Sequence, residues 1–427
     1  METIKKDIFY KDQHVRITTF GDGSCHLIRS FGNIGVIETN EGLVLFDITG
    51  KNLGAKSIYG LREITDKPIK YIIYSHGHFD HCFGYEPFIN EIKEKGWDMP
   101  QIIAHENCIK RFEKYKMLEE YHVWINSMQF SSIPERQRGL TTVIKILDPT
   151  IIIRGNDEYK FNLGNNTFEI YHDIGETDDS LWMYVPEKNT LFTGDLMISA
   201  YPNVGNPYKV QRYPKHWALA MEKMMKKKVK YLVPGHGRLI EGEEQVKEAL
   251  SITAEAMHFV HDEIVKRMNQ GKWFEQIYHE MLELYPEKFK QNRFLQWVYG
   301  SYQFAIHAVY RLYHGWYDTG NPTDLFPSKS TDIAKTLLEI NSEEKYLNHA
   351  KKLYDEKKLQ LALHILDIIL KAEDTVSTKI ILDAYNLKYK VLKEKVAQET
   401  SLIARNIMNN GANEIKTQLK EIEKHNK

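Results

Sequence analysis

Short apolar runs alternate with turn residues through the first 50 positions, and they predict a meander of antiparallel strands. The runs occupy residues 15–17, 25–28, 34–38 and 42–47. Helical patterns at 56–65 and 85–95 then alternate with strand patterns at 71–74 and 100–104. Strands first, followed by strand and helix in alternation, favour a layered α/β fold.

Apolar strand patterns return at 151–153, 159–161, 168–171, 181–185, 191–195 and 231–234. After residue 245 the pattern becomes helical. Residues 246–330 read as a helical connector crowded with aromatic side chains, which either wall an apolar pocket or pack helices against a sheet. Residues 331–427 carry helical periodicity with little glycine or proline, as in Leu347, Ala350 and Leu353. We therefore expect an α/β region over 1–245, the connector, and an all-α region over 331–427.

Residues 106–142 interrupt this order with a helical or irregular segment rich in aromatic and amide side chains, including Tyr121, Trp124 and Gln129. Long insertions in compact domains are often functional. The segment is interpreted either as an insertion that lies over the site or as a peripheral helix packed by its aromatic residues.

The strongest chemical signal is His76-Gly77-His78-Phe79-Asp80-His81, which directly follows the strand pattern at 71–74. Neutral imidazole and carboxylate are ligands for zinc and iron. His76 and His78 are too close in sequence to share one helix face, so ligation from a loop is favoured, and Gly77 lets the backbone bend between them.

Three further strand patterns end at possible ligands beside glycine: Gly175-Glu176, Gly194-Asp195 and Gly235-His236. Ligands at the ends of separate strands can converge on one rim of a rigid fold. Asp47 also closes an apolar run. It is placed either to hold one metal-bound imidazole in its tautomer or to cap a helix.

Composition narrows the function classes. The 57 Lys and Arg residues nearly balance the 58 Asp and Glu residues, so no field of one sign favours nucleic acid or an anionic membrane. No run of about 18 apolar residues predicts a membrane span, and the N-terminus lacks an apolar signal core. Three cysteines cannot form a disulfide framework. We expect a cytoplasmic protein.

The ordered motifs at 76–81, 175–177, 193–195 and 234–237 resemble those of the metallo-β-lactamase-fold hydrolases. That superfamily usually has His where this chain has Glu176, and a glutamate there is typical of its alkylsulfatase branch. The segment 309–322 and the tail motifs at 403–406 and 410–412 are similar to the alkylsulfatase dimerisation domain. A tetratricopeptide-like module is the alternative for the tail. We expect no C-terminal sterol-carrier-like domain, which many alkylsulfatases have.

The resemblance implies an αββα sandwich over 1–245 and a helical dimerisation domain over 331–427, through which the chain would form a homodimer. It implies two divalent metal ions, with zinc the first choice and iron or manganese the alternatives. The implied ligands are His76, His78 and Glu176 for one ion, Asp80, His81 and His236 for the other, and Asp195 as the bridge between them. Asp80 and Asp195 would be the catalytic carboxylates.

The implied activity is hydrolysis of an alkyl sulfate or related anionic ester by a hydroxide that bridges two metals. The loop after Asp195 offers Lys209, Arg212 and Tyr213 as donors for the anion, and Arg212 is the best candidate because its guanidinium can bind an oxyanion in two places. Asn203 and Asn206 would add amide donors or serve only to form the turn. The alternatives are an iron-dependent oxidoreductase of the same fold, similar to persulfide dioxygenases, and a hydrolase of another ester, lactone or phosphodiester.

Overall fold

The computed structural model describes residues 3–11, 13–141 and 147–425. Thr142, the expected end of the insertion, lies outside these ranges, as do residues 1–2 and 426–427. The chain divides into two compact units. One comprises residues 1–124 and 134–314, and the other comprises residues 125–133 and 315–427.

The first unit is built on two mixed sheets. In the larger sheet, β1 to β5 pair antiparallel in chain order and β5 to β8 pair parallel. Its strands are β1 (Ile4–Tyr10), β2 (Gln13–Phe20), β3 (Cys25–Arg29), β4 (Ile34–Glu38), β5 (Leu43–Phe46), β6 (Ile69–Ile73), β7 (Gln101–His105) and β8 (Ile151–Ile153). The sequence pattern did not predict β1, because its side chains are mostly exposed and it forms a sheet edge.

The smaller sheet has the order β14-β13-β12-β11-β10-β9, and only the β12–β13 pair is parallel. Its strands are β9 (Tyr159–Leu163), β10 (Asn166–His172), β11 (Leu181–Val185), β12 (Thr190–Gly194), β13 (Tyr231–Pro234) and β14 (Ile240–Glu241). The two sheets face each other across a buried apolar layer in which the rings of Phe46 and Phe192 lie 5.7 Å apart.

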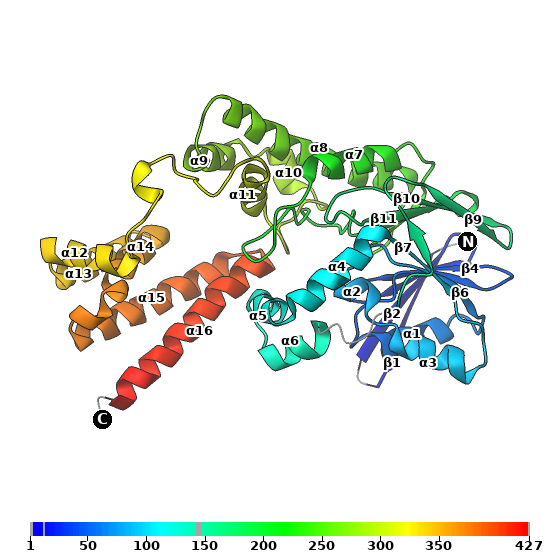
Figure 1. Cartoon of the computed structure of the whole chain (residues 1–427), viewed down its shortest axis with the longest axis horizontal. Coiled ribbons are helices and arrows are strands. Elements are labelled where there is room, and N and C mark those ends of the chain that lie inside the picture. Colours follow the sequence, from blue (N-terminus) through cyan, green and yellow to red (C-terminus); the bar gives the residue numbers. More distant parts are fainter. Residues whose placement is uncertain (1–2, 12, 142–146, 426–427) are drawn as a thin grey trace. The chain divides into compact units, whose positions relative to one another are not determined.

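Helices cover the outer faces of both sheets (Figure 1), so the predicted αββα sandwich is confirmed. Leu61, Phe88 and Phe112 pack on the larger sheet, and Trp217 and Met257 pack on the smaller one. The helices of this unit are α1 (Gly54–Arg62), α2 (Phe79–Cys82), α3 (Glu86–Glu94), α4 (Glu106–Met117), the start of α5 (Glu119–Gln129), α6 (Pro134–Thr141), α7 (Pro214–Met224), α8 (Glu243–Asn269), α9 (Phe274–Leu284), α10 (Glu287–Gln291) and α11 (Tyr302–Tyr313).

The aromatic connector belongs largely to this unit. Tyr302, Tyr310 and Phe294 are buried in the apolar cluster that covers the smaller sheet. The packing interpretation therefore holds for these three aromatic side chains.

The second unit is all-α, as expected for the tail. Its helices are α12 (Ser330–Ile340), α13 (Glu343–Asp355), α14 (Leu359–Lys371), α15 (Thr378–Gln398) and α16 (Leu402–His425), and the last four share one apolar core. Residues 125–133 belong to it because two amides of α16 bind their backbone. Asn406 donates to the carbonyl of Gln129 at 2.8 Å, and Asn410 donates to that of Met128 at 2.7 Å.

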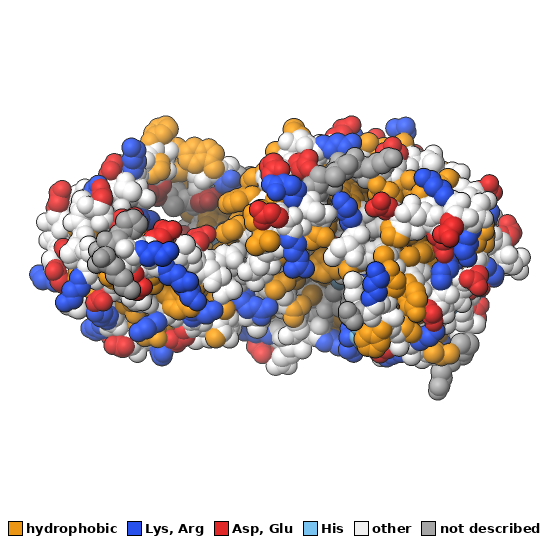
Figure 2. Space-filling view, turned by 90° about the horizontal axis from the view of Figure 1, so that it is seen from below, with side chains coloured by type: hydrophobic (Ala, Val, Ile, Leu, Met, Phe, Trp, Pro, Cys, Tyr) orange, Lys and Arg blue, Asp and Glu red, His pale blue; other side chains and the backbone are white. Residues whose placement is uncertain are grey.

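On the face drawn in Figure 2, acidic and basic side chains are interspersed. Among the described residues, no helix is both long enough and apolar enough to cross a bilayer.

Candidate metal centre

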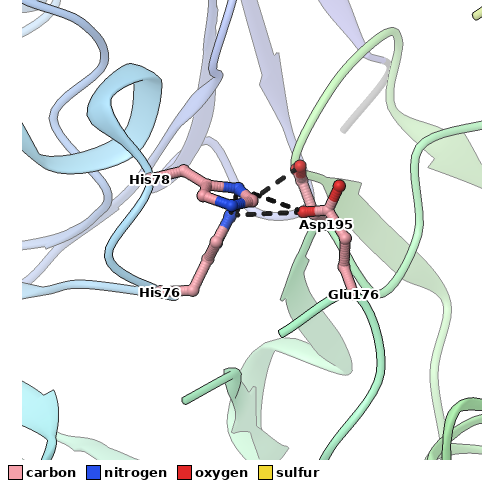
Figure 3. Close-up of side chains that lie close together, drawn as sticks. All are labelled: His76, His78, Glu176 and Asp195. Atoms are coloured by element: carbon pink, nitrogen blue, oxygen red, sulfur yellow. Dashed lines mark hydrogen bonds and ion pairs between the residues drawn. The ribbon is translucent and has the colours of Figure 1, made fainter. Parts of the chain in front are cut away.

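All seven side chains expected as metal ligands converge in the first unit. They form two groups, within each of which the ligand atoms lie within 4.8 Å of one another: His76, His78, Glu176 and Asp195, and then Asp80, His81 and His236. Figure 3 shows the first group, with two histidines facing two carboxylates. His76 and His78 lie in the loop after β6, and the other two side chains follow β10 and β12.

Asp195 lies between the two groups. Its Oδ2 is 3.8 Å from His76 Nε2, and its Oδ1 is 3.2 Å from both His81 Nε2 and His236 Nε2. Asp80 completes the second group at 3.5 Å from His236 Nε2. A carboxylate whose two oxygens face different groups has the geometry of a bridge.

The donor atoms also fit cations chemically. Glu176 Oε2, His81 Nε2 and Asp195 Oδ1 are buried and have no hydrogen-bond partner within the described chain. Buried polar atoms without a partner are costly, and all three point into the clusters. Nitrogen and carboxylate oxygen in this mixture suit zinc or iron.

The charges around these side chains also favour a cation. Burial lowers the pKa of His236, but Asp195 and Asp80 overcome it and raise that pKa to about 9. Burial likewise opposes the charged form of His81, yet Asp195, Asp47 and Asp80 raise its pKa well above the usual range. The carboxylates therefore create a field that favours positive charge at this place.

Three of the histidines have their outer ring nitrogen fixed. His81 Nδ1 contacts Asp47 Oδ2 at 2.8 Å, His76 Nδ1 contacts Ser75 Oγ at 2.9 Å, and His236 Nδ1 contacts the carbonyl of Phe31. A proton held on Nδ1 leaves the Nε2 lone pair for a metal. Of the two interpretations of Asp47, the structure supports the one in which it orients an imidazole.

The histidine loop is also held by a pair that the sequence did not reveal. Asp179 Oδ2 accepts from the backbone N–H of Gly77 at 2.8 Å, and Arg111 of α4 pairs with Asp179 at 3.1 Å. A Cβ on Gly77 would lie 3.1 Å from both Arg111 and Cys108. Gly77 is therefore needed for close packing. Asp179 follows the Glu176 motif closely, but nothing in the sequence links it to Arg111.

A second close approach joins the strand ends of the smaller sheet. The N–H of Gly235 donates to the carbonyl of Gly194 at 2.8 Å, and a Cβ on Gly235 would lie 2.2 Å from Asp195 Oδ1. Glycine beside His236 therefore leaves room for the bridging carboxylate.

Arg212 lies beside Glu176. One nitrogen, Nη1, donates to both Glu176 Oε1 and the carbonyl of Asn203, the latter at 2.7 Å. Burial would raise the pKa of Glu176, but Arg212 holds it far below the usual range. Arg212 thus positions an expected ligand, and its contact with substrate stays a prediction.

The two asparagines differ. The Oδ1 of Asn206 accepts from the N–H of Tyr208 at 2.9 Å, which is the turn-forming role. Asn203 is buried, and its side chain is 3.5 Å from that of Asn206. Their contacts with substrate also stay predictions.

Two family models match the chain. One, described as the metallo-beta-lactamase superfamily, matches residues 27–236, and the other, described as alkyl sulfatase dimerisation, matches residues 274–418. The second match favours the dimerisation domain over a tetratricopeptide-like module for the tail.

The curated relatives that the chain resembles include two sulfatases. A linear primary-alkylsulfatase from Pseudomonas is 26% identical over 71% of this chain and 60% of its own length. An alkyl/aryl-sulfatase from Saccharomyces cerevisiae is 24% identical over 72% of this chain and 50% of its own length. The chain thus spans only 50–60% of these curated relatives.

Among solved structures, the stereoselective inverting sec-alkylsulfatase Pisa1 from Pseudomonas superposes with a TM-score of 0.79 at 20% identity. The match covers 92% of this chain and 64% of that one. At this identity the likeness establishes the fold.

Proposed function

We propose that the chain is a metal-dependent hydrolase of sulfuric esters and belongs to the alkylsulfatase branch of the metallo-β-lactamase superfamily. The observation that carries the proposal is the placement of Asp195 between two complete groups of ligand atoms. The preferred substrate class is an alkyl sulfate or a related anionic ester.

We propose two divalent cations, with zinc as the first choice. His76, His78 and Glu176 would hold one, Asp80, His81 and His236 the other, and Asp195 both. Bound there, such a pair would supply a nucleophile at neutral pH, because divalent cations lower the pKa of water toward about 7. Glu176 in place of a neutral ligand adds negative charge, which makes iron or manganese the alternatives.

The remaining side chains orient the site. Asp47 fixes the ring of His81, the carbonyl of Phe31 fixes that of His236, and Arg212 holds Glu176 in place. The loop at 203–212 would also meet the anionic head of the substrate. The Arg212 guanidinium and the amide of Asn203 are the proposed contacts, with Asn206 shaping the turn between them.

The test is metal content followed by turnover. The purified chain should contain two zinc ions and hydrolyse primary or secondary alkyl sulfates in a panel that includes phosphodiesters, lactones and β-lactams. His78→Ala should abolish turnover while the protein stays folded, whereas His364→Ala, at an exposed position of α14, should not. Cleavage of another ester with alkyl sulfates inert would refute the substrate class. One or two irons in a protein that hydrolyses none of these esters would favour the oxidoreductase.

We also propose a homodimer formed through residues 331–427. The helices α12 and α14 pack on each other and expose apolar side chains, with Ile340 77% and Leu361 53% exposed. Both side chains lie within residues 274–418, which match the alkyl sulfatase dimerisation model, so they are the proposed contacts between two copies of the chain. Light scattering should give a dimer for the full chain and a monomer for Ile340→Asp/Leu361→Asp. Val298→Asp, at an exposed site of the first unit, is the control. An unchanged mass for the double variant would contradict this interface.

A further inference from the structure

Two buried imidazoles stack face to face at the ends of strands from different sheets. His105 closes β7 of the larger sheet, and His172 closes β10 of the smaller one. Their ring centroids lie 3.8 Å apart, and the ring planes differ by 4°. Both side chains are buried, and neither belongs to the two ligand groups. Buried polar rings are unfavourable unless their nitrogens are hydrogen-bonded, so the partners of these nitrogens indicate what the pair does.

His105 fixes the start of α4. Its Nδ1 accepts a hydrogen bond from the backbone N–H of Asn107 at 3.2 Å, which caps the helix. The ring proton therefore lies on Nε2, and Nε2 donates to the carbonyl of Gly155 at 2.9 Å. The ring thus ties the N-terminus of α4 to the turn that follows β8.

His172 binds the loop that carries Glu176. Its Nε2 donates to the carbonyl of Asp178 at 3.0 Å, and because a carbonyl only accepts, the proton lies on this nitrogen. Burial lowers the pKa of His172, and the neighbouring His105 contributes in the same direction. The ring is therefore neutral near pH 7, and a neutral ring can stack on a second imidazole without charge repulsion.

The same carbonyl accepts a second hydrogen bond, which comes from α4. Asn107 Nδ2 donates to the Asp178 carbonyl at 3.1 Å. Lys110 donates to Asn107 Oδ1 at 2.8 Å and so orients the amide. Arg111 of the same helix pairs with the side chain of Asp178. One peptide of the loop is therefore held by two elements, β10 through His172 and α4 through Asn107.

Asp178 lies between two carboxylates that act at the first ligand group. Glu176, two residues before it, has its Oε2 3.4 Å from His76 Nε2. Asp179, the next residue, accepts from the backbone N–H of Gly77 at 2.8 Å and so holds the histidine loop. A shift of the Asp178 peptide would therefore displace an expected ligand and the histidine loop together.

The second ligand group is oriented by other contacts. Asp47 fixes the ring of His81, and the carbonyl of Phe31 fixes that of His236. Neither contact involves the loop at 173–180. The two ligand groups thus have separate supports, so loss of one support should affect one group.

We propose that His105, His172 and Asn107 are positioning residues for the first ligand group. They act by holding the Asp178 peptide, on which the placement of Glu176 and of the histidine loop depends. This assignment rests on the proposed function for the presence of the metal pair. It gives α4, the first helix of the segment 106–142, a supporting part in the site.

The test isolates one ligand group at a time in the full chain. His236→Ala leaves the first group complete, and His78→Ala leaves the second. In the His236→Ala chain, adding His172→Phe should weaken Zn²⁺ binding about 10- to 100-fold, because phenylalanine can keep the stack but has no donor. In the His78→Ala chain, the same addition should leave the zinc constant unaltered. A general loss of stability would weaken both constants.

A conservative variant and a metal-free measurement complete the test. His172→Gln keeps an N–H donor for the Asp178 carbonyl and should recover most of the zinc affinity. His279→Phe, at an exposed position of α9, is the control. Without metal, amide hydrogen exchange at Gly77 should be faster in His172→Phe, whereas exchange at Gly235, which is bonded to a strand end of the smaller sheet, should not change.

The possible results separate this assignment from the proposed activity. Equal losses of zinc affinity by both groups, no loss by either, or no zinc binding by the unaltered chain would overturn the positioning role. If only the first group loses affinity and the protein turns over no sulfuric ester, the positioning role stands and the proposed activity fails. Turnover of alkyl sulfates together with either of the first two results would refute the positioning role alone.

Discussion

Asp47 offers the sharpest test of the metal centre, because both of its contacts are donors. Its Oδ1 accepts from the backbone N–H of Ser75 at 2.7 Å, and its Oδ2 faces His81 Nδ1 at 2.8 Å. In Asp47→Asn, one oxygen becomes an NH2 group. The amide can then satisfy only one of the two donors.

The outcome of that competition is fixed by chemistry. The N–H of Ser75 cannot move its proton, whereas an imidazole can exist as either tautomer. The amide oxygen should therefore face Ser75 and its NH2 should face His81, which moves the ring proton to Nε2. Nε2 is the nitrogen that faces Asp195, and a proton on it removes the lone pair that would bind a metal. The ring can then bind a metal only if this proton returns to Nδ1, where it would face the NH2 group of the new amide.

Loss of such an orienting partner weakens metal binding about 10- to 100-fold, equivalent to roughly 1.4–2.7 kcal/mol. The substitution should not strain the backbone, because Asp47 has φ 66° and asparagine adopts that conformation readily. Metal-free protein would be titrated with Zn²⁺ against a chromophoric chelator. One of the two binding constants should fall by this factor.

The control is Asp22→Asn, the same chemical change at a surface carboxylate that pairs with Lys188. Activity of Asp47→Asn should be low at limiting Zn²⁺ and recover in excess. Two unaltered zinc constants in Asp47→Asn would refute the proposed role of the carboxylate.

Three further predictions concern stability. Arg111→Met removes the cation that pairs with Asp179, a carboxylate that is 0% exposed, and should lower the free energy of unfolding of the first unit by about 3–5 kcal/mol in urea titrations. The control Arg136→Met, at an exposed position, should leave this free energy unchanged. Asn410→Ala removes the donor to the carbonyl of Met128 and should cost the second unit about 1–3 kcal/mol, seen as faster amide exchange at 128–132, with exposed Asn413→Ala as the control. Burial lowers the pKa of His26 from 6.5 to about 4, so the unfolded chain binds the proton first as the pH falls, and the free energy of unfolding should drop by roughly 3 kcal/mol from pH 6.5 to pH 4. A His26→Gln variant with the same pH dependence would contradict this.

The sequence was sufficient for the arrangement of the centre because each expected ligand follows an apolar strand. Glu176 comes after β10, Asp195 after β12 and His236 after β13, and the ends of packed strands form one rim. Asp47 could be recognised for the same reason, since it closes β5. The spacing of ligands along the chain and the strand pattern together specify this part of the structure.

The supporting contacts could not be found in this way, because they join elements with no shared pattern. Arg111 lies on a helix of the segment 106–142, and its partner Asp179 lies in a loop 68 residues later. The assignment of residues 125–133 to the helical unit depends on the side-chain amides of Asn406 and Asn410. Both asparagines belong to motifs of the tail, but a motif does not reveal which backbone carbonyl an amide will meet.

Arg212 shows why the sequence does not reveal such contacts. A guanidinium binds carboxylate and sulfate through the same donors, so residue type alone cannot say which anion it meets. In the folded chain Arg212 is buried against Glu176, an anion of the protein itself, and this contact is what keeps a glutamate usable as a ligand. A centre that replaces a neutral histidine by a glutamate gains a negative charge, and the buried guanidinium beside Glu176 compensates that charge.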